Sequence, residues 1–521
     1  MIRTCAYISI AILSLASRSP LAQDSVLECF SRDLNSASKI SACSHALAQD
    51  DLSDETRALA LVSRGAARAQ SNDKNAALID YDASLKLIPD DFSTRLARGR
   101  LLEERGQRQA AEVDFSRVID RAPPTQEVLL GEAYARRGAL RLEIGDTSSG
   151  ISDLGEARRF DPRNPMPFKA RGAYFLKEND IEQAAAELEQ AANLNAGDVE
   201  VQLMLGSVQL RRGQSDSAVR AFSSTLIVKP NNAEGLRGRA AAYGQKQNYA
   251  AAITDYTAAL NINGKDIAAL EGRGAALLRI GAFAAATHDF DKLLTLMPEN
   301  NRAVFFRANA RFQSGDPVGA AADFSAILSR QPANADALLG RGIARQFLGN
   351  YVGAETDFTA LLKEVPDAAQ PLANRGYARV MAGAFSAASE DLMKAMSRPN
   401  APKHLALWKF VADARAGNSK PDTLTLAMRG MDPAQWPAPL MRYFLGEAAG
   451  NEVISAAIEV PKVSSGRLCE TYFFLGQAAL MLSDTTEAQR LFKAAIDTGA
   501  VRFTEYAGAR AELSRLTKTN E

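Results

Sequence analysis

The sequence repeats itself every 34 residues, and this period limits the possible folds more than any other feature. The stretch RGIARQFLGNYVGAETDFTALLKEVP begins at Arg341, and RGYARVMAGAFSAASEDLMKAMSRP begins 34 residues later at Arg375 with the same skeleton. The same frame gives ten repeats over residues 57–400, with one step of 39 residues in place of 34. Its first column is Arg64, Arg98, Arg137, Arg171, Leu205, Arg239, Arg273, Arg307, Arg341 and Arg375.

Two columns of small residues and one column of large residues accompany this first column. The next residue is glycine in eight repeats and alanine in two, and the residue twelve positions later is alanine in nine. Four residues beyond that alanine stands Tyr, Phe or Leu, on the same face of a helix. A glycine inside a helix costs about 1 kcal/mol relative to alanine, so its recurrence needs a cause. We therefore predict two helices per repeat that approach closely where glycine and alanine stand.

An acidic residue precedes the large residue in nine of the ten repeats. The exceptional repeat is also the one without arginine, because Leu205 goes with Ala221. We therefore expect the arginine of the first helix to form an ion pair with the acid of the second. The pairs include Arg273–Asp289, Arg307–Asp323 and Arg341–Asp357. Removing one partner of a buried pair costs roughly 3–5 kcal/mol, which favours a structural role over a catalytic one.

A 34-residue helix–turn–helix repeat with this arrangement of small and aromatic residues resembles the tetratricopeptide repeat (TPR) family. The resemblance covers roughly residues 57–400 and departs at the first column, where the family commonly has Leu and this chain has Arg. It implies an all-α fold, a right-handed superhelical TPR solenoid of antiparallel helix pairs. The first helices of the pairs would line a concave groove.

Residues 1–22 have the layout of a secretory signal peptide. Arg3 precedes an apolar run from Ala6 to Ala16, and small and polar residues follow. The run is too short to span a bilayer as a permanent anchor. We therefore expect cleavage near Ala22, export to the periplasm or the medium, and no stable membrane insertion.

The cysteines after this segment suggest different environments. Residues 23–56 are expected to form an N-terminal helical hairpin that carries Cys29 and Cys43. In an oxidising compartment this pair can form a disulfide, and two buried thiols are the alternative. Cys469 lies among apolar residues with no histidine nearby, which favours packing in a core over a reactive thiol.

Residues 401–521 leave the regular frame and then regain it. Gly476, Ala488 and Phe492 repeat the small–small–large spacing, and a last helix near residues 503–516 is expected to cap the stack. Stretches such as Leu407-Trp408, Gln435-Trp436, Tyr443-Phe444-Leu445-Gly446 and Leu491-Phe492-Lys493 resemble the C-terminal half of bacterial envelope lipoproteins of the NlpI family. That family consists of periplasm-facing adaptors that bring proteases and peptidoglycan hydrolases together. This chain departs from it by having no lipobox cysteine and a longer repeat array.

Charge and motifs point away from nucleic acid, cofactors and catalysis. The 61 basic and 61 acidic residues cancel, so there is no general attraction for nucleic acid. The three histidines, His45, His288 and His404, are far apart in sequence. No HExxH, phosphate-binding glycine loop, GxSxG or paired CxxC motif occurs. We therefore expect no metal, no cofactor and no enzymatic activity.

Family geometry places the positions two before and two, five and six after each arginine near the groove. In the last three repeats these positions are unusually apolar. The candidate partner-binding residues are Phe305, Asn309, Phe312, Leu339, Ile343, Phe347 and Tyr377. Two interpretations stay open: the cluster receives an apolar helix or extended peptide, or it packs inward and against the chain's own C-terminal helices.

These observations lead to the hypothesis of an exported, non-enzymatic scaffold that mediates protein–protein interactions in the bacterial cell envelope. The proteins that it organises would include proteases or peptidoglycan hydrolases. The alternative is a structural component that assembles with copies of itself in an envelope or secretion complex. The sequence favours no particular oligomeric state.

Overall fold

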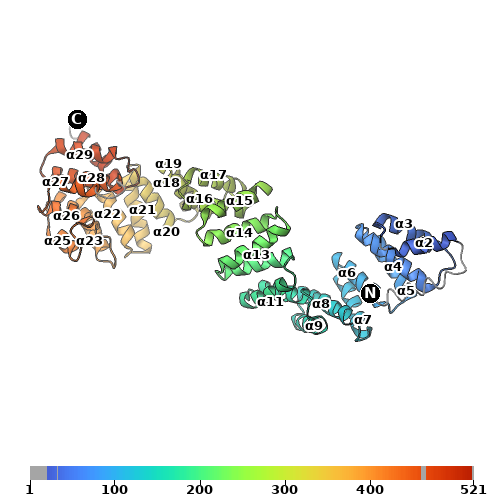
Figure 1. Cartoon of the computed structure of the whole chain (residues 1–521). Coiled ribbons are helices and arrows are strands. Elements are labelled where there is room, and N and C mark those ends of the chain that lie inside the picture. Colours follow the sequence, from blue (N-terminus) through green and yellow to red (C-terminus); the bar gives the residue numbers. More distant parts are fainter. Residues whose placement is uncertain (1–19, 32, 459–464, 519–521) are drawn as a thin grey trace. The chain divides into compact units, whose positions relative to one another are not determined.

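The computed structural model describes residues 20–31, 33–458 and 465–518, and every regular element in these ranges is an α-helix (Figure 1). The chain divides into two compact units, Met1–Lys246 (unit 1) and Gln247–Glu521 (unit 2). The signal segment expected at residues 1–22 lies outside the described residues, except for the three residues that begin α2.

Unit 1 consists of helices that pair in sequence order. They are α2 (Pro20–Phe30), α3 (Ser36–Leu47), α4 (Asp54–Gln70), α5 (Lys74–Leu87), α6 (Phe92–Glu104), α7 (Arg108–Arg121), α8 (Glu127–Ile144), α9 (Thr147–Phe160), α10 (Met166–Lys177), α11 (Ile181–Leu194), α12 (Val199–Arg211), α13 (Ser215–Val228) and α14 (Ala233–Gln245). Cys29 of α2 and Cys43 of α3 form a disulfide, which links the two helices of the N-terminal hairpin.

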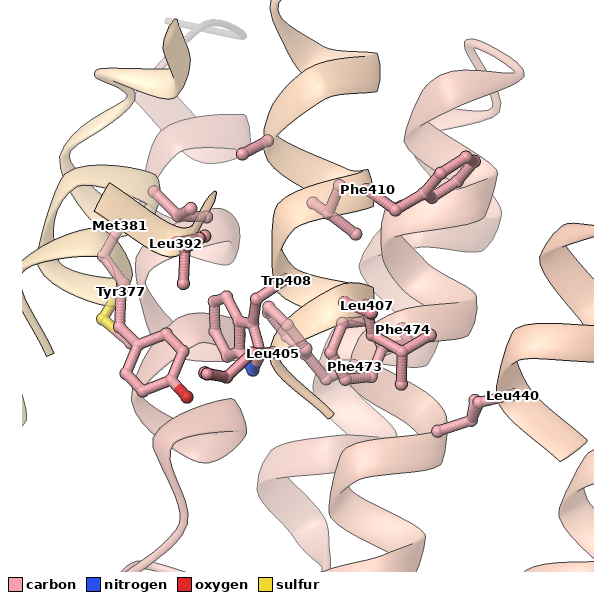
Figure 2. Packing of buried hydrophobic residues seen from close by; sticks show 14 of the residues in the cluster. Tyr377, Met381, Leu392, Leu405, Leu407, Trp408, Phe410, Leu440, Phe473 and Phe474 are labelled. Carbon is pink, nitrogen blue, oxygen red and sulfur yellow. The ribbon is translucent and has the colours of Figure 1, made fainter. Parts of the chain in front are cut away.

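Unit 2 contains the remaining repeat helices and the C-terminal body. They are α15 (Tyr249–Ile262), α16 (Ile267–Arg279), α17 (Phe283–Leu296), α18 (Asn301–Gln313), α19 (Pro317–Arg330), α20 (Ala335–Phe347), α21 (Tyr351–Glu364), α22 (Ala369–Ala382), α23 (Phe385–Met396), α24 (Leu405–Arg415), α25 (Asp422–Met428), α26 (Ala438–Phe444), α27 (Gly450–Ile458), α28 (Ser465–Met481), α29 (Thr485–Asp497) and α30 (Thr504–Lys518). Trp408 of α24 is fully buried at the centre of the C-terminal body (Figure 2).

The turn between the two helices of a repeat recurs with one backbone conformation. Its central residue has a φ between 57° and 92° in all ten repeats, a left-handed conformation that glycine adopts most readily. These residues are Asn72, Gly106, Gly145, Asn179, Gly213, Gln247, Gly281, Gly315, Gly349 and Gly383. The next residue often caps the second helix, as where Asn350 Oδ1 accepts a hydrogen bond from the Gly353 N–H at 2.9 Å. Each turn therefore ends one helix and starts its partner within a few residues.

The glycine column makes room for the large side chain of the second helix. A methyl group added to Gly342 would lie 2.5 Å from the Phe358 ring, and one added to Gly206 would lie 2.7 Å from Phe222. The helices therefore approach closely at this column, as expected, and the nearest neighbour of the glycine is the side chain sixteen residues later. Ala354 is buried beside it at 0% exposure. The helices approach closely because a ring fills the space that glycine leaves.

The same large side chains also meet the following repeat. Where alanine replaces glycine in the column, at positions 240 and 308, the residue before the next arginine is glycine, Gly272 or Gly340. A methyl group on Gly272 would collide with Tyr256, and one on Gly340 with Phe324. Each of the ten large side chains thus has a glycine on at least one side.

The arginine column forms bidentate ion pairs with the acid of the second helix in seven repeats, whereas Arg171 reaches Glu187 through a single contact of 3.1 Å. Arg273 donates through Nε and Nη2 to the two carboxylate oxygens of Asp289, at 2.8 and 2.7 Å, and the aspartate side chain is 1% exposed. This hydrogen bonding raises the pKa of the Arg273 guanidinium. The same two bonds occur in Arg64–Asp80, Arg98–Asp114, Arg137–Asp153, Arg307–Asp323, Arg341–Asp357 and Arg375–Asp391.

The third guanidinium nitrogen joins neighbouring repeats. Arg273 Nη1 donates to Thr257 Oγ1 of the preceding repeat at 3.0 Å, and Arg307 Nη1 donates to Asp291 at 2.8 Å. Arg98–Asp82, Arg239–Ser223, Arg341–Ser325 and Arg375–Thr359 are the corresponding contacts elsewhere. One arginine therefore ties its own helix to the second helices of two successive repeats.

Five of the acids accept a hydrogen bond from a second arginine, one helical turn after the first. Asp357, for example, accepts from Arg345 Nη1 at 2.7 Å as well as from Arg341. The additional arginines are Arg68, Arg141, Arg311, Arg345 and Arg379. These repeats carry two cations for one buried carboxylate, whereas Asp289 pairs with Arg273 alone among the described residues.

Replacing Gly342 with alanine should destabilise unit 2 by about 1–3 kcal/mol, because the added methyl group overpacks against Phe358. Gly206→Ala should destabilise unit 1 by a similar amount, because Phe222 lies 2.7 Å from the new methyl group and already packs against Gly238 on its other side. Gly155→Ala, with no atom within 4 Å of the new methyl group, should stabilise unit 1 by up to about 1 kcal/mol. Urea unfolding followed by circular dichroism measures all three, and a loss of stability at Gly155 as large as those at Gly342 and Gly206 would contradict the close fit of the rings.

A double-mutant cycle should separate the energy of the Arg273–Asp289 ion pair from the packing of the two side chains. Asp289→Ala alone should destabilise unit 2 by roughly 3–5 kcal/mol, because it leaves Arg273 without its acid. Adding Arg273→Leu should recover most of this loss, because the double variant copies Leu205 and Ala221.

The matched control is the double variant Arg341→Leu with Asp357→Ala. It should recover less stability, because Arg345 loses its carboxylate as well. Thermal unfolding of the four single and two double variants tests both cycles. Additive losses in the Arg273 cycle would contradict direct coupling.

Candidate protein-binding site

Two neighbouring first helices carry a half-buried apolar surface. On α18 and α20 the candidate residues recur at spacings of three and four, which place them on one face of each helix. We name the following six residues the α18–α20 surface: Phe305, Asn309, Phe312, Leu339, Ile343 and Phe347. The two helices join at their C-terminal ends, where the rings of Phe312 and Phe347 meet edge to face at 5.2 Å.

Part of each side chain in this surface packs inward. Phe305 lies edge-on to the core ring of Phe324 at 5.9 Å, and Leu339 and Ile343 pack against the cluster around Phe358. Asn309 Nδ2 donates to the Phe305 carbonyl oxygen at 3.0 Å. All six residues nevertheless keep part of their surface accessible.

Tyr377, which the repeat register assigns to the groove, lies instead in the C-terminal core. Its exposure is 6%, its ring is 4.8 Å from that of Trp408, and its hydroxyl is 3.2 Å from His404 Nε2 (Figure 2). Burial raises the pKa of Tyr377 and lowers the pKa of His404. The reason is the C-terminal body, in which Trp408 of α24 lies against the Tyr377 ring and α30 lies on α22.

The C-terminal helix α30 is seated on the first helices α20 and α22. Arg515 Nη2 donates to the Met381 carbonyl oxygen at 2.7 Å, and Arg510 Nη1 donates to the Phe347 carbonyl oxygen at 3.5 Å. The expected last helix therefore does more than cap the stack. It occupies the side of the last two repeats that the family resemblance assigns to the groove, next to the α18–α20 surface.

An aromatic row runs along the turns of unit 2, and the sequence analysis missed it. The first residue of the second helix is aromatic in four of the five repeats, at 34-residue multiples: Tyr249, Phe283, Tyr351 and Phe385. Arginines of the C-terminal segment stack on this row, Arg502 over Phe283 at 5.2 Å and Arg515 over Phe385 at 5.8 Å. The C-terminal segment thus reaches from the start of α17 to the start of α23. The regular spacing of the aromatic residues is the signal that could have revealed it.

Positive charge borders the α18–α20 surface. Arg510 adjoins it through the Phe347 carbonyl, while Arg279 and Arg502 lie at the end of α16 and beside the start of α17. All three side chains are exposed. None has a carboxylate oxygen within 4 Å in the part of the chain that the structure describes, although Arg279 stacks on Tyr249 at 5.8 Å.

The described residues offer little for metal or nucleophile chemistry. No three His, Cys, Asp or Glu side chains among them gather as a metal site requires. Cys469 is buried, and burial raises the pKa of its thiol to about 12. In the described ranges, no helix combines the length and the apolar character that crossing a membrane demands.

Comparisons with known proteins agree with this geometry. A family model described as "Tetratricopeptide repeat" matches residues 175–242, and a second model with the same description matches residues 272–337. "Tetratricopeptide repeat protein 37" of Xenopus laevis is 24% identical over 168 residues, which cover 32% of this chain. The match spans 10% of that relative's own length.

Solved structures of tetratricopeptide repeat proteins are also similar. One from Parabacteroides merdae ATCC 43184 is 22% identical and covers 47% of this chain and 97% of its own, with a TM-score of 0.36. YrrB, described as a TPR protein with an unusual peptide-binding site, is 18% identical and covers 36% of this chain and 95% of its own, with a TM-score of 0.31. The two family matches, together with the 34-residue register that joins them, support tetratricopeptide repeats in residues 175–242 and 272–337 of this chain.

Proposed function

We propose that this protein is an exported scaffold of the bacterial cell envelope, and that its α18–α20 surface binds an amphipathic helix of a partner protein. The observation that carries the proposal is the half-buried aromatic surface, which remains accessible beside the seated helix α30. The scaffold acts by holding proteins together and carries out no reaction itself.

The occupant is a helix because this protein already places a helix on neighbouring elements of the same kind. The 15-residue helix α30 lies against α20 and α22. The first helices of successive repeats are equivalent. The α18–α20 surface can therefore receive a helix in the way that α20 and α22 receive α30. Amphipathic helices bind such seats through side chains spaced three and four residues apart.

The apolar face of the partner is expected to meet Phe312 and Phe347, whose rings stand at the junction of the two helices. Large aromatic side chains and arginines supply most of the binding energy in protein interfaces. The exposed arginines 279, 502 and 510 lack carboxylate partners among the described residues, which favours acidic residues beside that apolar face.

The envelope location rests on the sequence. The layout of residues 1–22 is that of a signal peptide, and Cys29 and Cys43 are close enough to be bonded, as extracytoplasmic proteins permit. The C-terminal stretches that resemble the NlpI family support adaptor function and point to envelope proteases or peptidoglycan hydrolases as the kind of protein that is organised.

A photo-cross-linking amino acid at position 312 tests the surface in living cells. Partner proteins should become attached there, and the attached peptides should be acidic, amphipathic helices. The matched control places the same amino acid at Val352 of α21, which is 72% exposed and belongs to a second helix. Phe312→Ala should weaken binding of an identified peptide about tenfold, which corresponds to about 1.4 kcal/mol.

Attachment at position 352 as strong as at 312 would contradict the proposed surface. Attachment only to other copies of this chain would favour the self-assembling component instead. A fusion of the N-terminal 30 residues to alkaline phosphatase, which is active only after export, tests the location separately. An inactive fusion would overturn the envelope assignment without affecting the binding surface.

A further inference from the structure

Two glutamates in the C-terminal body lie against the two tryptophans of the chain, Glu505 buried and Glu470 half-buried. Trp408 Nε1 donates to Glu505 Oε1 at 3.0 Å, and Trp436 Nε1 donates to Glu470 Oε2 at 2.8 Å. Glu505 is 7% exposed, and no Lys or Arg nitrogen lies within 4 Å of its carboxylate among the described residues. An indole N–H is a neutral donor, so it compensates only part of the cost of burying a negative charge.

The titratable groups near this pair stand on α22, at the start of α24 and on α28. Tyr377 of α22 and His404 at the start of α24 are neutral at physiological pH, because burial raises the pKa of the tyrosine and lowers that of the histidine. Cys469 of α28 is a neutral thiol. Arg467, also on α28, is the one cation that acts on Glu470 among these groups. The carboxyl pair is therefore held mainly by neutral neighbours.

These surroundings favour the protonated carboxyl. Burial first, and then the charge of Glu505, raise the pKa of Glu470 to about 8, while Trp436 and Arg467 act in the opposite direction. Burial also raises the pKa of Glu505. Two carboxylates that share a poorly solvated site cannot both ionise without loss of stability.

The position of Glu505 connects this pair to α30. It is the second residue of α30, and its hydrogen bond to Trp408 fastens that helix to the centre of the C-terminal core. Glu512, two helical turns further along α30, forms ion pairs with Arg415 and Arg515. Only the first turn of α30 thus depends on a carboxyl without an ion-pair partner.

We propose that Glu470 and Glu505 form a pH-sensitive latch: α30 stays seated on α20 and α22 while the pair keeps a proton, and its first turn loosens when both carboxyls ionise. This inference concerns the chain alone and does not depend on the proposed partner.

The direction of the effect follows from linkage. A carboxyl whose pKa is raised on folding contributes its full stability below its ordinary pKa, and that contribution is lost as the pH rises through the folded value. With the pKa of Glu470 at about 8, the C-terminal body should weaken progressively from mildly acidic to mildly alkaline pH.

Tryptophan fluorescence of the full-length protein reports on the latch directly, because the chain has only two tryptophans and both donate to the pair. We expect the emission to titrate with a midpoint near pH 8. Hydrogen exchange of residues 504–518, corrected for the intrinsic rate, should increase about tenfold between about pH 6 and about pH 9. The double variant Glu470→Gln with Glu505→Gln should lose both transitions, because its amides cannot ionise but still accept from the indoles.

Glu447→Gln is the matched control, since Glu447 is exposed on the same body. It should keep the wild-type pH dependence. Equal exchange of α30 at both pH values in the wild-type protein, or unchanged transitions in the double variant, would overturn the latch.

If the double variant does not fold, the wild-type protein still tests the proposal. Infrared spectra of the wild-type protein should show a protonated carboxyl band at neutral pH that disappears as the pH rises, and its absence at neutral pH overturns the proposal. The single variant Glu470→Gln should shift the remaining transition to lower pH, because Glu505 then ionises beside a neutral group.

Discussion

The fold depends on one guanidinium that is bonded to three helices. In the repeat of Arg273 it joins its own helix to Asp289 within the repeat and to Thr257 of the preceding one. Glycine lets two helices come close, but an apolar contact alone would permit small shifts along the helix axis. The fixed geometry of the arginine fork does not, because each nitrogen needs its own acceptor. The repeat with Leu205 and Ala221 gives up both charges together, which avoids a buried carboxylate without a cation.

Contacts made by the same residue type in successive repeats could be predicted from the sequence. Contacts made by different residue types at one position could not. The arginine, acid, glycine and large-residue columns could be read directly, and the helix pairs lie where those columns place them. The acceptor in the preceding repeat was not recognised, because Asp, Ser and Thr share the position and only a common hydrogen-bonding capacity unites them. The glycine that compensates for alanine at position 308 lies in the following repeat, at Gly340. The role of Gly340 becomes clear only in the structure, where the Phe324 ring packs against it.

The candidate site was predicted less completely for a different physical reason. Periodicity describes contacts between neighbours in the stack, whereas the contact between Arg510 and Phe347 joins residues 163 positions apart. No local pattern specifies where α30 will lie, because its seat is formed by helices that are close to it only in space. Tyr377 follows the interpretation in which the cluster packs against the chain's own C-terminal helices, since α24 and the C-terminal core cover it. Phe312 fits the expectation better, because it keeps accessible surface and is absent from the residues that pack against the C-terminal core.

Phe347 links the two proposals, because it belongs to the α18–α20 surface and also packs against the C-terminal core. A partner helix that buries more of this ring must compete with part of the contact that α30 makes. Unseating α30 would then strengthen binding of such a partner, and the bound partner would weaken the seat of α30 by the same coupling free energy, because coupling between two equilibria is reciprocal. A partner that contacts only Phe305 and Phe312 would bind with the same affinity whether or not α30 is seated. The pH dependence of binding therefore indicates how far along the first helices a partner extends.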